Sequence, residues 1–118
     1  EPWQLERLKA EAEKGMPILL FLHNPIYTPE LFRELTKHQT CAFLAGVPNE
    51  LTANYPPDRR EQQFADETTL ETMAYLKTCP QIRAIFAGHL HFDAETMVTD
   101  TLPQYITGMT TARVIRVR

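Results

Sequence analysis

The sequence contains no apolar run long enough to cross a membrane, and it has only two cysteines. Its longest apolar run, from Met16 to Leu22, is much shorter than the about 20 residues that a spanning helix needs. Cys41 and Cys79 show no CxxC spacing, which favours reduced thiols in a reducing compartment. The chain opens on Glu1 without a basic or apolar leader, so no secretory signal is visible. We therefore expect a cytoplasmic protein with no membrane partner.

Positive charge is not in excess either. Lysine and arginine number 12 against 15 aspartates and glutamates, which gives a net charge of −3. Strong binding to nucleic acid or to an anionic membrane would need a basic excess or a basic patch, so we expect no nucleic-acid partner. With 43% hydrophobic and 23% charged residues, the 118-residue chain has the composition and length of one ordinary domain, residues 1–118.

Short apolar runs and helix-start signals follow one another along the chain. Residues 17–22 and 82–87 are apolar without alternation, which is typical of strands covered on both faces of a parallel sheet. The expected elements are a helix from Pro2 to Gly15, a strand over 17–22, a helix from Thr28, a strand or buried loop over 41–47, an irregular segment over 48–60, a helix from Thr68 to Pro80, and strands over 82–87, 104–107 and 112–118. This order predicts an α/β fold with a sheet flanked by helices.

Histidines follow both of the buried strands. His23 comes directly after the first strand, and His89 and His91 come after the second strand and Gly88. If the strands are parallel neighbours in one sheet, their carboxyl ends lie on the same edge and the three imidazoles can meet there. In an extended loop, both rings of the H-x-H pair would point to the same side. Imidazole suits Zn, Mn or Fe better than Mg or Ca, so we predict a metal site at this edge. His38, at a predicted helix end, is expected to be a surface residue.

Three segments resemble the calcineurin-like metallophosphoesterase family. Leu22–Pro25, with the sequence LHNP, is similar to its H-x-P segment, and Ala87–His91, with the sequence AGHLH, is similar to its closing G-H-x-H motif. Gln4–Leu8, with the sequence QLERL, resembles the helix that precedes the H-x-P strand. The resemblance implies a layered α/β/β/α fold and metal-dependent hydrolysis of phosphoesters, in which two metal ions activate a water molecule.

The resemblance also implies a ligand set. His23 and His89 would bind one divalent ion, and His91 would bind the other. The ions would be Mn, Fe or Zn. No catalytic side chain besides these ligands is identified in the chain.

The family's first motifs, D-x-H, G-D-x-x-D and G-N-H-[DE], are missing. The four glycines are followed by Met16, Val47, His89 and Met109, so neither G-D nor G-N occurs. We therefore expect residues 1–118 to be the C-terminal half of a phosphoesterase domain whose N-terminal half is its missing partner. The chain alone should bind metal weakly or not at all, should be inactive, and should self-associate through the surface that the missing half would cover.

Two alternatives compete with this hypothesis. His89-x-His91-x-Asp93 also matches the start of the H-x-H-x-D-H signature of metallo-β-lactamase-like hydrolases, but Ala94 replaces the last histidine and no histidine follows His91. The other alternative is a nonenzymatic binding or structural module with a vestigial or mononuclear metal site.

Overall fold

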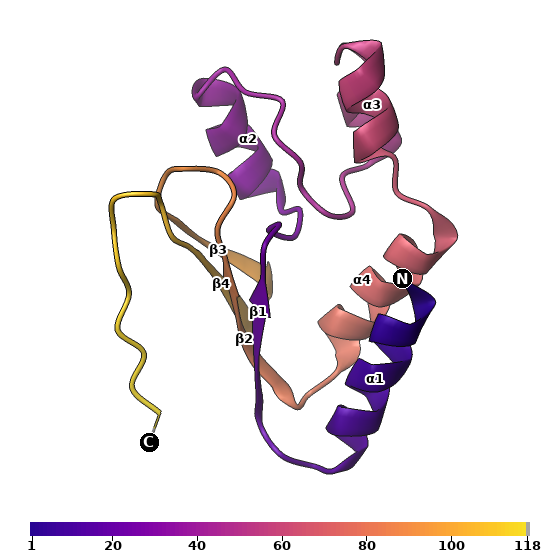
Figure 1. Ribbon diagram of the computed structural model, residues 1–118, viewed down its shortest axis with the longest axis vertical. Coiled ribbons are helices and arrows are strands. Elements are labelled where there is room, and N and C mark those ends of the chain that lie inside the picture. Colours follow the sequence, from indigo (N-terminus) through magenta and orange to yellow (C-terminus); the bar gives the residue numbers. More distant parts are fainter. Residues whose placement is uncertain (118) are drawn as a thin grey trace.

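Residues 1–117, the part of the chain that the computed structural model describes, form a four-stranded sheet flanked by helices (Figure 1). The elements are α1 (Pro2–Glu13), β1 (Ile18–Leu22), α2 (Pro29–Lys37), the 3₁₀ helix η1 (Asn49–Thr52), α3 (Pro57–Gln63), α4 (Glu67–Thr78), β2 (Ile82–Ala87), β3 (Ala94–Thr99) and β4 (Leu102–Ile106). The predicted α/β class is confirmed. None of the helices in this range has the length and apolar character needed to cross a membrane.

The strand order is β1-β2-β4-β3. β1 and β2 pair in parallel, as do β2 and β4, whereas β3 runs antiparallel to β4. Leu22 at the end of β1 lies opposite Ala87 at the end of β2. The chain therefore leaves both strands at the same edge of the sheet, with His23 and Gly88 as the next residues.

One face of the sheet is covered by α1 and α4, which lie side by side (Figure 1). An ion pair of 3.0 Å between Lys9 Nζ and Glu71 Oε1 links the two helices. The core beneath them is built from both helices and from the strands, with Ala12, Leu76, Ile82, Ile85 and Leu102 among its buried members. This core packs against one face of β1 and β2, the two strands after which the histidines follow.

A second core lies under α2. Leu31 and Leu35 of this helix are buried against Leu44, Leu90 and Ile106. The loop that carries His89 and His91 is thus fixed in the molecule through Leu90, the residue between them.

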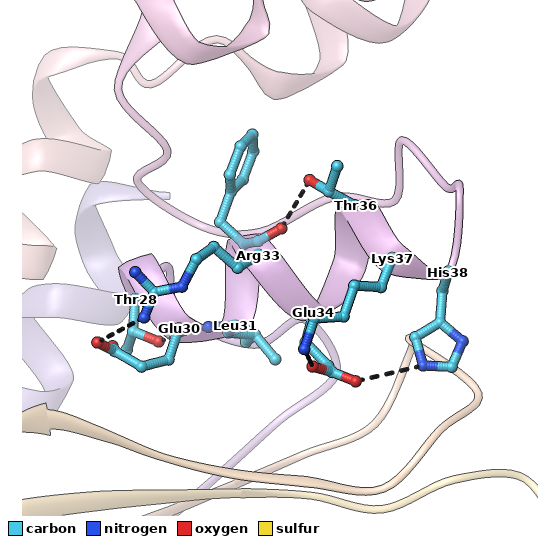
Figure 2. Close-up of polar contacts among 9 residues, drawn as sticks. Thr28, Glu30, Leu31, Arg33, Glu34, Thr36, Lys37 and His38 are labelled. Carbon is cyan, nitrogen blue, oxygen red and sulfur yellow. Dashed lines mark hydrogen bonds and ion pairs between the residues drawn. The ribbon is translucent and has the colours of Figure 1, made fainter.

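The polar contacts along α2 lie on its surface, except for the buried cap at its start (Figure 2). Thr28 caps the helix by accepting a hydrogen bond of 3.1 Å from the backbone N–H of Leu31. His38 follows the helix, where its Nε2 lies 3.8 Å from a Glu34 oxygen and its ring stacks on Phe92 with centroids 4.2 Å apart. This exposed position confirms the expectation that His38 is a surface residue.

Two helical boundaries differ from the sequence-based expectation. The segment 48–60, predicted to be irregular, contains η1 and the start of α3, because Pro57 occupies the first turn of a helix, where its missing N–H costs nothing. Helix α4 begins earlier than Thr68, because the side chain of Asp66 caps it with a 2.7 Å hydrogen bond from the Thr69 N–H. Hydrogen bonding from the Thr69 side chain, together with the bond from its backbone N–H, lowers the pKa of the Asp66 carboxyl.

The last strands also differ. Residues 112–117 lie outside any strand, and Arg118 of the predicted strand lies outside the described residues. β3, which the sequence pattern did not reveal, pairs with the edge of β4 instead. The segment 41–47 is a loop, held to the chain after β1 by a single bridge between Ile26 and Ala45. Of the two expectations for it, the loop is correct.

The other face of the sheet carries an open row of aromatic side chains. Phe21, Phe86 and Tyr105 lie on adjacent strands and stack with centroid distances of 5.0 and 5.3 Å. Arg113 extends the row over the Tyr105 ring and pairs with Glu95 at 2.7 Å. The side chain of Phe21 is 64% exposed. The expectation that β1 is covered on both faces is therefore wrong, because α1 and α4 cover only one of them.

We expect this open face to promote self-association. Exposed apolar patches and unpaired edge strands such as β1 favour contacts with other chains. Replacing Phe21 with lysine should shift the chain from dimers or larger assemblies toward monomers in sedimentation at micromolar concentration. Trp3→Lys is the matched control, because Trp3 is 66% exposed but lies on α1. A strictly monomeric unsubstituted chain would contradict the expectation.

Candidate functional site

His23 and His89 meet at the edge of the sheet where β1 and β2 end. Nε2 of His23 lies 3.2 Å from Nδ1 of His89, and the ring centroids are 5.0 Å apart. The backbone segments that follow β1 and β2 are also hydrogen-bonded, since the Gly88 N–H donates to the His23 carbonyl at 3.2 Å. The pairing of parallel strands thus brings together two imidazoles that are 66 positions apart in the sequence.

The loop after His23 is held by a buried glutamine from another strand. Gln104 of β4 has 0% of its surface exposed. Its Oε1 accepts from the Ile26 N–H at 2.6 Å, and its Nε2 donates to the Ile26 carbonyl at 2.9 Å. The Gln104 side chain thus bonds the two backbone groups of Ile26 as a neighbouring strand would. Because these bonds fix the chain three residues after His23, Gln104 positions the site from the interior.

The loop that carries His89 and His91 is not extended, contrary to the expectation. Both histidines have left-handed backbone angles, with φ of 67° and 63°. Leu90 between them is buried in the core under α2, whereas His91 is exposed. Burial of Leu90 offsets the cost of the two left-handed residues, which is about 1–2 kcal/mol each for a side chain with a Cβ. Strain of this kind often occurs at functional sites.

Glycine should be preferred over alanine at position 91. With φ at 63°, the His91→Gly variant should be about 1 kcal/mol more stable to urea than His91→Ala. The same comparison at the exposed Ala74, inside α4, should reverse in sign, because Ala74→Gly costs about 1 kcal/mol in a helix. Equal stability of the two variants at position 91 would show that the loop relaxes out of the left-handed conformation.

The surroundings of His89 favour its neutral form. Partial burial lowers the pKa of His89 below its usual value, and the nearby rings of His23 and His91 lower it further. A neutral imidazole keeps a nitrogen lone pair for a ligand. The environment therefore suits metal binding by His89 at neutral pH.

His91 does not join the pair in a complete ligand set. Among residues 1–117, no group of three or more His, Cys, Asp or Glu side chains is arranged to hold a metal ion. The described residues thus supply two close nitrogens, and His91, two residues after His89, does not complete a three-residue ligand group with them. Any further ligands for an ion at the pair would have to come from other groups.

Each histidine of the pair lines a different cavity. The larger, of about 550 Å³, is lined by His23 and by side chains of α1, β1 and α4. The smaller, of about 340 Å³, is lined by His89, His91, Arg59 and Gln62. No sequence signal marks Arg59 or Gln62, because both fall at or just beyond a segment expected to be irregular.

Comparison with models of known protein families, with curated proteins and with solved structures found no match. The resemblance to metallophosphoesterases therefore depends on the three short motifs alone.

Proposed function

We propose that His23 and His89 hold one divalent metal ion of a phosphoester-hydrolysing centre, with His91 as a ligand of a second ion. The observation that carries this proposal is the 3.2 Å separation between Nε2 of His23 and Nδ1 of His89. It occurs at the carboxyl ends of adjacent parallel strands, the usual place for a ligand site in an α/β sheet.

The separation fits two ligands of one ion. Zinc–imidazole bonds of about 2.0–2.1 Å place two ligand nitrogens about 2.9–3.4 Å apart, for angles at the metal between 90° and 109°. The observed 3.2 Å falls inside this range, and it is equally a hydrogen-bonding distance between the two ring nitrogens. A bound Zn, Mn or Fe ion would supply Lewis-acid polarisation of the phosphoryl group and a lower pKa for water. The chain's own contribution is to orient the two rings and to keep His89 neutral.

The site lacks carboxylate ligands among residues 1–117. Two neutral imidazoles supply no negative charge, so we expect the chain alone to bind metal weakly and to hydrolyse no phosphoester. We propose that the missing ligands belong to an N-terminal half of the domain. The same half would contribute the second sheet of a layered α/β/β/α fold and cover the open row of Phe21, Phe86 and Tyr105.

Hydrolysis of an aryl phosphate tests this function. The longer parent protein, supplied with Mn²⁺ or Zn²⁺, should turn over the substrate and should lose most of its activity in His89→Ala. His38→Ala should keep the activity, because His38 lies on the surface beyond α2. The chain alone should show no turnover, since members of a catalytic unit act together.

A nonenzymatic metal site is the second candidate. It is favoured by the absence of a third ligand around the pair within the described residues. A longer parent protein that binds metal through His23 and His89 but hydrolyses no phosphoester would support this candidate and contradict the first.

A further inference from the structure

The two cavities beside the histidine pair differ in charge. Among the residues 1–117 that line the smaller cavity, Arg59 is the one permanent cation, and no aspartate or glutamate is present. Of the described residues that line the larger cavity, Asp66 and Glu1 carry carboxylates, and none is a lysine or arginine. In a chain with a net charge of −3, the lining of the smaller cavity therefore carries a local positive charge.

Arg59 lines the smaller cavity, and 54% of its side chain is exposed. It lies in α3, and its Nη1 donates to Gln62 Oε1 at 3.2 Å, which holds the guanidinium beside another cavity residue. Its nearest carboxylate, Asp58, is 3.9 Å from Nε and does not line the cavity. A guanidinium has five N–H donors, so several remain for a ligand after the bond to Gln62. Planar donor pairs of this kind suit phosphate oxygens.

The larger cavity has an apolar floor. Side chains of three elements, α1, β1 and α4, form it: Leu5, Leu8, Leu20, Leu22, Met73 and Leu76. Its volume of about 550 Å³ is in the range of small-molecule sites. His23 lines this cavity, His89 lines the smaller one and Phe43 lines both, so the two cavities are neighbours on either side of the 3.2 Å contact between the rings.

We infer that the two cavities divide a phosphate ester of an apolar or aromatic alcohol between them. The phosphate oxygens bind Arg59 in the smaller cavity, and the organic group lies on the apolar floor of the larger one. The ester bond then lies beside His23 and His89. This inference rests on the proposed function, since it assigns the substrate class of the same site, and it makes Arg59 a binding residue.

Ligand titrations of the chain in the presence of a chelator test the inference without any metal. Phenyl phosphate, glycerol phosphate and inorganic phosphate are titrated into ¹⁵N-labelled chain and followed by NMR. Arg59→Gln should weaken all three by about tenfold or more, the usual effect of losing a hydrogen bond to a charged group. Arg60→Gln is the matched control, because Arg60 is the next residue of α3 and does not line the cavity. Phenyl phosphate should bind about tenfold more tightly than glycerol phosphate, because its ring is removed from water.

Three outcomes would overturn the inference: no binding of phosphate esters, equal effects of Arg59→Gln and Arg60→Gln, or equal affinity for the phenyl and glycerol esters. Failure of the proposed function can be told apart from failure of this inference. If metal does not bind the histidines but phenyl phosphate still binds through Arg59, the anion site stands and the metal centre is wrong.

Discussion

Replacing Gln104 with alanine is expected to lower the free energy of unfolding by about 3–5 kcal/mol. The side chain is fully buried and bonds both backbone groups of Ile26. Its removal leaves a buried N–H and a buried carbonyl without partners, at about 1–3 kcal/mol each, and adds the cost of a cavity. Urea unfolding followed by circular dichroism would measure the loss.

Two further variants separate the causes. Gln104→Met keeps most of the volume but loses both bonds, so it should recover only the part of the loss that comes from the cavity. Gln62→Ala removes an exposed glutamine and should change stability by less than about 0.5 kcal/mol. A loss below about 1 kcal/mol in Gln104→Ala would show that water or a shifted loop satisfies Ile26.

Replacing either His23 or His89 with alanine should weaken Zn²⁺ binding by more than about tenfold. Substitutions that only support a metal ligand usually cost 10–100-fold, so loss of a ligand should cost at least as much. The affinity of the unsubstituted chain for Zn²⁺ should itself be low, because the pair supplies two neutral nitrogens. Complete four-ligand zinc sites, by comparison, gain about 10–16 kcal/mol from binding the ion. Isothermal titration of the purified chain would give the affinities.

The other two histidines serve as comparisons in the same titration. His38→Ala should leave the affinity unchanged, because its ring stacks on Phe92 away from the pair. His91→Ala should have a smaller effect than His89→Ala, because His91 does not complete a three-ligand group in the described residues. A tight site with two bound ions would show that the ligand set has been misjudged.

The sequence predicted the part of the site that depends on regular structure. Apolar runs at 17–22 and 82–87 form β1 and β2, and the parallel pairing brings His23 to His89. These are local patterns whose consequences follow from the geometry of a sheet. The conformation of the loop at His91 could not be predicted, since it depends on the burial of Leu90 in a core built by distant residues.

Contacts between distant segments account for most of what was missed. Gln104 appears in the sequence as one polar residue of a strand, and its role follows only from its contact with Ile26, which is 78 positions away. Arg59 lines the same cavity as His89 and His91 through the placement of α3 rather than through any motif. β3 was missed because its pairing with β4, and not its own pattern, makes it a strand.

Titration of ¹³C,¹⁵N-labelled chain with Mn²⁺, followed through the imidazole signals, would test the central claim most directly. A bound paramagnetic ion broadens signals from nearby nuclei. If His23 and His89 share an ion, their ring signals should broaden first and together, at the lowest Mn²⁺ concentration, while those of His38 persist. Equal broadening of all four histidines, or broadening of His91 and His38 before the pair, would contradict a metal site formed by His23 and His89.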